Sequence, residues 1–260
     1  MDQRLDFRFS IPAPAEGPLV ELSAQEAEKM LLQKLEEEKN EPTDALWQLA
    51  RFYQQVKQHE KGLACLREAL AHMPDVETKA QCVLGMGQMM EAVQDYEAAV
   101  RYYREALSLE PLQTHTWYFI NNNLGFSLNT LKQFAEGEKY CRNAIQIDPN
   151  RPNAFKNLGL ALKGQGEYRE AAKFFVTATK VNAADARSLR LLQELLCEHP
   201  ELDCEFQDDV AGCQKAVEVA AQKLAESRPV VYRGWRKQVI LLQGKLRFLG
   251  RKVRKLFQSS

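Results

Sequence analysis

A segment of 34 residues that recurs four times in the middle of the chain is the strongest constraint on its fold. The copies span residues 43–76, 80–113, 118–151 and 152–185. Their best-matched column holds alanine in every copy, at Ala69, Ala106, Ala144 and Ala178. A proline follows this column in three copies, at Pro74, Pro111 and Pro149. A period of this length predicts a solenoid, in which each unit buries its apolar face against its neighbours.

The shared columns resemble those of the tetratricopeptide repeat family, whose unit is a helix, a turn and a second helix. A large apolar residue followed by a small one recurs at Leu49 and Ala50, Met86 and Gly87, Leu124 and Gly125, and Leu158 and Gly159. Small side chains let two helices approach closely, and proline ends a helix because it lacks an N–H. The resemblance implies an all-α fold, a right-handed superhelical solenoid of helix-turn-helix repeats with flanking helices.

The spacing between the copies predicts which helices are longer. The alanine column advances by 37, then 38, then 34 residues. The extra residues amount to about one helical turn of 3.6 residues, so they can lengthen a first helix without rotating its buried face. We therefore expect long first helices in the second and third copies, with Asp75 and Thr114 as their N-caps.

Two segments precede the four repeats of residues 43–185. Residues 1–22 carry apolar side chains at alternate positions and are predicted to form an extended N-terminal arm. Ser23 and Glu26 have the spacing of a capping box. This motif predicts that an N-terminal helix occupies 23–42.

The chain after the repeats is also predicted to be helical. Residues 186–199 have the pattern of a helix that caps a solenoid. Within 200–260, two apolar stripes with alternating steps of three and four residues flank the helix breakers Pro229 and Gly234. We expect a C-terminal helical hairpin, in which each helix buries its stripe on the other or on the end of the solenoid.

The end of the chain carries a strong positive charge. From Arg228 onward there are ten Lys or Arg and no Asp or Glu, although the formal net charge of the chain is zero. The polar side of the last predicted helix is formed by Lys237, Lys245, Arg247, Arg251, Lys252, Arg254 and Lys255. Three interpretations stay open, in order of preference: a packed hairpin with an exposed basic face, contact with an anionic membrane surface, and nucleic-acid binding.

The composition, with 45% hydrophobic and 27% charged residues, is typical of a soluble globular protein. The six cysteines form no CxxC pair, and the first residues lack the profile of a signal peptide. No apolar run approaches the roughly 18 residues that indicate a membrane span. We therefore expect a cytoplasmic protein.

The concave face of a repeat solenoid, lined by the first helix of each unit, is where such proteins bind partners. The predicted groove residues are Phe119, Asn122, Asn123, Phe126, Asn129, Asn153, Lys156, Asn157, Lys163, Arg187 and Arg190. Asparagine amides can donate to and accept from a peptide backbone, and the cations favour acidic side chains or a C-terminal carboxylate. Packing of the two phenylalanines and local hydrogen bonding of the asparagines are open alternatives.

Catalytic and metal chemistry are weakly indicated. Cys197, His199, Cys204 and Cys213 occur in one region, but only the first two have the spacing of a close ligand pair. Buried helix cysteines are therefore the favoured interpretation. The other histidines have no apparent nucleophile or acid partner. We expect no enzymatic activity, no cofactor, no metal and no small-molecule substrate.

These patterns together predict a non-enzymatic adaptor or scaffold. Its partner is expected to be a protein or peptide segment of acidic character, held in the concave groove. The alternative is a membrane-peripheral assembly protein that acts through the basic amphipathic C-terminal helix.

Overall fold

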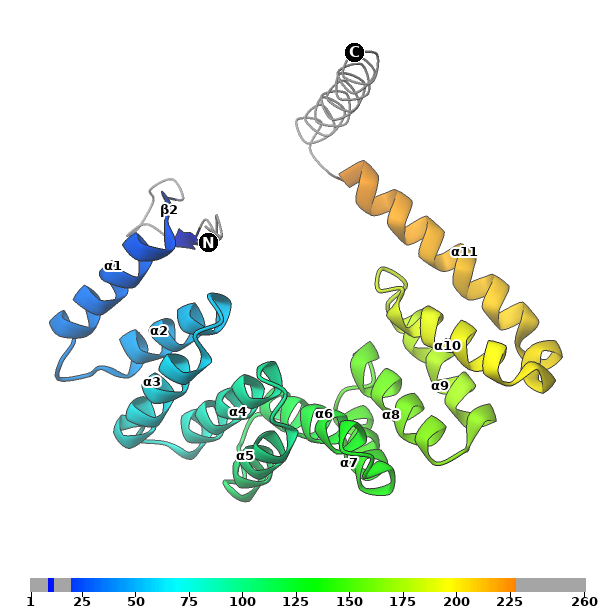
Figure 1. Ribbon diagram of the computed structural model, residues 1–260, viewed down its shortest axis with the longest axis horizontal. Helices are drawn as coiled ribbons and strands as arrows, with labels where there is room; N and C mark the ends of the chain where they lie inside the picture. Colours follow the sequence, from blue (N-terminus) through cyan, green and yellow to red (C-terminus); the bar gives the residue numbers. More distant parts are fainter. Residues whose placement is uncertain (1–8, 12–19, 228–260) are drawn as a thin grey trace, which may run out of the picture.

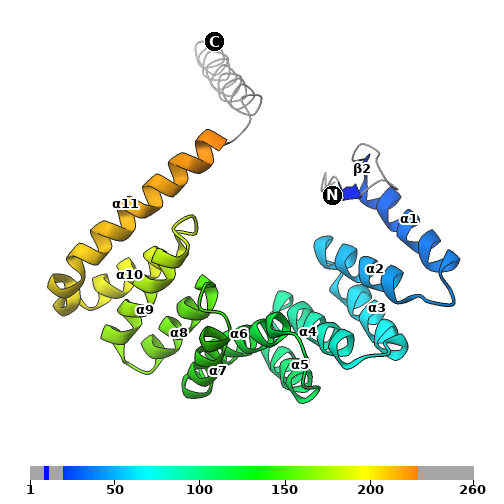
Figure 2. The same cartoon turned by 180° about the vertical axis from the view of Figure 1, so that it is seen from behind.

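The computed structural model describes residues 9–11 and 20–227 of the chain. Helices dominate this part, and they follow one another along an arc with an open concave side (Figure 1). Figure 2 shows the same arc from behind, with the N-terminal helix at one end and the longest helix at the other. The predicted all-α solenoid is confirmed, apart from two short strands near the N-terminus.

Four helix pairs form the body of the solenoid. They are α2 (Thr43–Gln55) with α3 (His59–His72), α4 (Val76–Ala92) with α5 (Tyr96–Ser108), α6 (Thr114–Thr130) with α7 (Phe134–Ile147), and α8 (Pro152–Gly164) with α9 (Tyr168–Val181). In the first three pairs the first helix faces the inside of the arc and the second lies outside (Figure 1). The inner helices therefore form the concave surface.

A turn of three residues with the same backbone geometry joins the two helices of each pair. Its middle residue lies in the left-handed region, at Lys57, Gln94, Lys132 and Gly166. In each case the next backbone N–H donates to a carbonyl five residues earlier, as in Gln133 N to Leu128 O at 2.9 Å. This is the hydrogen bond that closes a helix C-terminus. Only the fourth turn has glycine, the residue that adopts this conformation without strain.

The expected long first helices are present. The inner helices α4 and α6 each have 17 residues, whereas α2 and α8 have 13. Asp75 caps α4 as predicted, because its carboxylate accepts from the backbone N–H of Thr78. The prediction that Thr114 caps α6 is wrong by one residue. The N-cap is Gln113, since the helix begins at Thr114, and the backbone N–H groups of Leu112 and Gln113 donate to Glu77 on α4.

Small residues in the repeat columns lie where two helices approach most closely. A Cβ atom added at Gly87 would lie 2.3 Å from the ring of Tyr103 on α5. The same addition at Gly159 would bring it 2.6 Å from the ring of Phe175 on α9. Both distances are shorter than atomic contact allows, so the outer helix can dock only where the inner helix has no side chain.

The N-terminal segment consists of a strand pair and a helix. Strand β1 (Phe9–Ile11) pairs antiparallel with β2 (Val20–Leu22), with Ser10 opposite Glu21. Helix α1 (Ala24–Glu37) begins at the predicted capping box of Ser23 and Glu26. It packs on α2 through a small apolar cluster, which consists of Ala27, Leu31, Leu49, Phe52 and Tyr53.

The C-terminal part caps the other end of the arc. Helix α10 (Arg187–Glu198) and a short 3-10 helix (Pro200–Leu202) lead into α11 (Asp203–Ser227). Phe206 and Cys213 of α11 are buried in the same core cluster as Phe175 of α9. The second helix of the predicted hairpin and the basic residues Lys237, Lys245, Arg247, Arg251, Lys252, Arg254 and Lys255 lie outside the described residues.

Candidate functional site

Three of the predicted groove residues lie in the interior between α6 and α8. Asn122, Asn129 and Asn157 have only 7%, 8% and 3% of their surface exposed. The Asn157 amide donates to Asn122 Oδ1 at 3.1 Å, and the Asn129 amide donates to the Asn157 carbonyl at 2.8 Å. These side chains join neighbouring inner helices. The Oδ1 atoms of Asn129 and Asn157 accept no hydrogen bond in the described part of the chain, so the network is only partly satisfied.

Asn123 lies at the edge of this network and is half-buried. Its Oδ1 accepts a hydrogen bond of 2.9 Å from the Asn122 amide. Because the oxygen is engaged, the Asn123 amide nitrogen is the group that can turn toward a ligand. Of the five predicted groove asparagines on α6 and α8, the half-buried Asn123 and the exposed Asn153 are therefore the two placed for external contact.

The two phenylalanines pack on neighbouring side chains. Phe119 is edge-on to Tyr118, with ring centroids 5.4 Å apart, and the Arg151 guanidinium lies 4.9 Å from its centre. Phe126 is edge-on to Tyr96 of the preceding pair, at 6.1 Å. Both rings are half-buried, so they contribute to packing and still border the concave surface.

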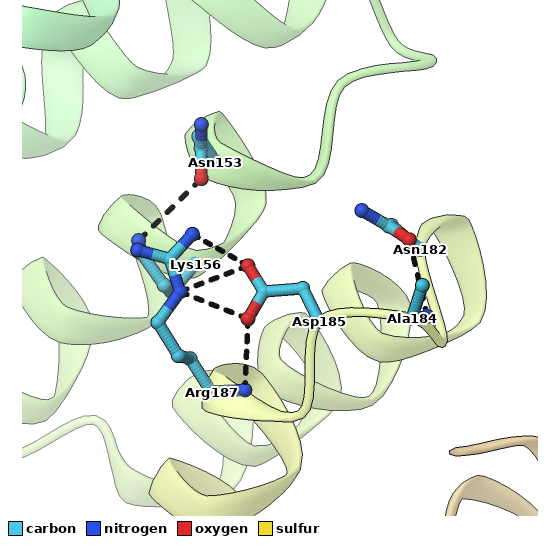
Figure 3. A network of polar contacts seen from close by, with 6 residues as sticks. All are labelled: Asn153, Lys156, Asn182, Ala184, Asp185 and Arg187. Carbon is cyan, nitrogen blue, oxygen red and sulfur yellow. Dashed lines mark hydrogen bonds and ion pairs between the residues drawn. The ribbon is translucent and has the colours of Figure 1, made fainter. Parts of the chain in front are cut away.

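Cationic side chains gather where α8 meets α10 (Figure 3). The half-buried Lys156 ammonium makes one long contact, 3.5 Å to Asn153 Oδ1. Burial lowers the pKa of Lys156, and the nearby Arg187 guanidinium lowers it further. No carboxylate within the described part of the chain forms an ion pair with Lys156. Its ammonium therefore has donors to spare for an anion.

Asp185 restrains the second cation of this cluster. Its carboxylate accepts from Arg187 Nε at 2.8 and 2.9 Å, and it also accepts from the Arg187 backbone N–H. These hydrogen bonds lower the pKa of Asp185 to about 2. Arg190 is exposed one turn further along α10, whereas Lys163 pairs with Glu198 at 2.7 Å. Lys156 and Arg187 thus share the single carboxylate of Asp185, and the two cations are suited to a further carboxylate ligand.

Two acidic residues on α4 were missed in the sequence. Glu77 is 7% exposed and accepts four hydrogen bonds, from Gln81, Thr116 and the backbone N–H groups of Leu112 and Gln113. Burial opposes the ionisation of Glu77, but these donors outweigh it and lower its pKa. Glu91 lies near the other end of α4. The only sequence signal for Glu77 was its place in the extra turn of a lengthened helix.

The candidate metal residues are placed in different environments. Cys213 is buried in the core, whereas Cys197 and Cys204 are exposed. His199 stacks on Tyr168, with ring centroids 3.6 Å apart. Among the residues that the structure describes, no three His, Cys, Asp or Glu side chains are arranged to hold a metal ion. Nor does any described helix combine the length and apolar character needed to cross a membrane.

The fold and the inner surface define a helical-repeat solenoid. Family models described as "Tetratricopeptide repeat" match residues 43–109 and 120–151. Residues 43–109 and 120–151 therefore belong to the tetratricopeptide repeat family. The predicted family resemblance is therefore confirmed.

Curated relatives match the repeats over part of their own length. The peroxisomal targeting signal receptor of Eremothecium gossypii is 30% identical over 113 residues, which are 44% of this chain and 19% of that protein. A small glutamine-rich tetratricopeptide repeat-containing protein 2 of Saccharomyces cerevisiae is 31% identical over 114 residues, covering 43% and 32%. The chain thus spans a third or less of these two relatives.

A solved structure shows the same fold. YrrB, described as a tetratricopeptide repeat protein with an unusual peptide-binding site, superposes with a TM-score of 0.54. The match is 21% identical in sequence and covers 76% of this chain and 100% of YrrB. At this identity the similarity is one of fold.

Proposed function

We propose that the protein is an adaptor that binds a segment of a partner protein along the concave surface, with the cluster of Lys156, Arg187 and Arg190 holding a carboxylate. The carboxylate belongs to an acidic side chain or to a C-terminus of the partner. Asn123 supplies a further hydrogen bond to the backbone of the bound segment.

The observation that carries this proposal is the incomplete hydrogen bonding of the Lys156 ammonium. Its ammonium is half-buried on α8, and its hydrogen-bond partner in the described part of the chain is a neutral amide oxygen at 3.5 Å. Its nearby anion, Asp185, is bonded to Arg187, so a carboxylate from outside would complete the hydrogen bonds of the Lys156 ammonium. The names of two matched proteins, a targeting signal receptor and a protein with a peptide-binding site, agree with this kind of ligand.

The buried asparagines have a supporting part in the proposed function. Because Asn122 and Asn157 are bonded to each other across α6 and α8, they fix the relative position of Asn123 and Lys156. Replacing Asn157 would disturb the fold as well as the site. Lys156 is therefore the better residue to change.

The test uses the full chain, immobilised, and a library of short synthetic peptides of randomised sequence. Peptides rich in Asp and Glu should be retained, and Lys156→Met should weaken their binding by about tenfold, the size of one lost charge-assisted contact. Lys139→Met on the outer helix α7, where the side chain is exposed, is the matched control. Retention of no peptide, or equal binding by the two variants, would overturn the proposal.

A further inference from the structure

Glu91 is a poorly satisfied acid on the inner helix α4. It lies in the last turn of α4 and is half-buried. Ser127 of α6 donates its hydroxyl to Glu91 Oε1 at 2.7 Å. Burial raises the pKa of Glu91 to about 6, and the hydrogen bonds from Ser127 and Tyr103 only partly oppose this. The carboxylate is thus less well stabilised than that of an exposed glutamate.

The surroundings of Glu91 offer further polar atoms. Tyr103 of α5 is 0% exposed, and its hydroxyl lies beside Glu91 and Asn123. This hydroxyl has no hydrogen-bond partner of normal geometry in the part of the chain that the structure describes. Asn123 contributes its side-chain amide from α6. Because the Tyr103 hydroxyl is fully buried, it lies on the interior side of Glu91 and leaves the exposed part of the carboxylate open.

Glu77 on the same helix shows what a completed site looks like. Glu77 accepts four hydrogen bonds from its neighbours, and its pKa is lowered. Glu91 accepts one of normal geometry, and none of the Lys and Arg side chains in the described ranges forms an ion pair with it. Glu91 therefore keeps acceptor capacity that the described residues do not use.

We propose that Glu91 forms a subsite for a basic side chain, Lys or Arg, of the bound partner segment. Its carboxylate supplies the oxygens that accept from an ammonium or a guanidinium, while Asn123 and the fully buried Tyr103 hydroxyl lie beside it. The inference rests on the proposed function and adds a second specificity element to it. The acidic subsite is on α4 and the basic cluster is at α8 and α10, with α6 between them (Figure 1). The partner segment would therefore carry a basic residue at one end and an acidic group at the other.

The test compares the full chain with Glu91→Gln in the same randomised peptide library. Glutamine has nearly the same shape as glutamate and can still accept from Ser127, so the fold is retained, which circular dichroism checks. Wild-type protein should retain peptides that combine a basic residue with an acidic one at a constant spacing. Glu91→Gln should lose the preference for the basic residue, with about tenfold weaker binding of a selected peptide, and keep the preference for the acidic one.

Two controls separate this inference from the proposed function. Glu105→Gln removes the same charge from an exposed position on the outer helix α5 and should leave binding unchanged. Lys156→Met should lose the acidic preference and keep the basic one. Retention of acidic peptides without any basic preference, or with one that survives Glu91→Gln, would overturn the Glu91 subsite alone. Retention of no peptide would overturn the proposed function and the subsite with it.

Discussion

Glu77 connects two inner helices, and replacing it by glutamine tests how the long helix α6 is held. The Oε2 atom accepts from the backbone N–H groups of Leu112, at 2.7 Å, and of Gln113, at 2.9 Å. The Oε1 atom accepts from Gln81, at 2.9 Å, and from Thr116. Glutamine keeps one oxygen and replaces the other by an amide that donates, so two of the four donors lose their acceptor.

The expected loss follows from these contacts. A hydrogen bond to a charged group contributes about 1.5–3 kcal/mol to stability. The loss of two such bonds would lower the free energy of unfolding by an amount at the upper end of that range or above it. Leu112 and Gln113 are exposed, so water can replace part of the bonding to their N–H groups. We therefore expect Glu77→Gln to lower the free energy of unfolding by about 2–3 kcal/mol. Because repeat units are stabilised by their neighbours, amide hydrogen exchange should rise first at the start of α6.

The measurement is urea unfolding followed by circular dichroism at several pH values. The folded pKa of Glu77 is lowered from its ordinary value of 4.5, so its contribution is complete above that pH and is lost as the pH falls through the folded pKa. The difference between wild type and Glu77→Gln should therefore be largest near neutral pH and shrink in acid. The control is Glu105→Gln. A loss below about 0.5 kcal/mol, or an equal loss for the control, would refute the reasoning.

Three further predictions concern unfolding free energies measured in the same way. Gly159→Ala should destabilise the fold by about 1–3 kcal/mol, because its Cβ would lie 2.6 Å from the ring of Phe175. Gly212→Ala on α11, where an added Cβ has nothing within 4 Å, should stabilise it by up to about 1 kcal/mol, and the reverse order would contradict the packing argument. Lys132→Gly should stabilise and Gly166→Ala should destabilise, each by about 1 kcal/mol, because both residues have positive φ; equal effects would count against strain at the turns. Asp75→Ala should remove the N-cap of α4 and destabilise by about 1 kcal/mol, and an unchanged midpoint would show that the cap is dispensable.

The helix pattern of this protein was predictable because it depends on local rules. The small residues at Gly87 and Gly159, the capping box at Ser23 and the additional turn before the second and third repeats each act over a few residues of sequence. Thr114 is the instructive exception. A side chain of its type is a normal N-cap, but the carboxylate of Glu77, on another helix, binds the N–H groups just before it. Sequence spacing does not show that contact.

The candidate site was predictable only in outline. The repeat register assigned Asn123 and Lys156 to the first helices of their repeats, and it assigned Asn122 and Asn157 to the same concave surface. In the structure, Asn122 and Asn157 lie in the interior. A periodic pattern assigns a residue to one face of a helix. It does not show whether the neighbouring helix covers that face, because that depends on the angle at which two repeats pack.

The amino-acid sequence by itself determined that this chain is a helical solenoid of tetratricopeptide repeats, since the period, the small-residue columns and the helix ends are all written along the chain. Tertiary structure alone decided which polar groups have enough hydrogen-bond partners. Glu77 and Glu91 are two glutamates on one helix, and burial acts against ionisation of both. The first meets four donors and has a lowered pKa, while the second meets few and has a raised one, because the number of hydrogen bonds depends on side chains that other helices bring to it.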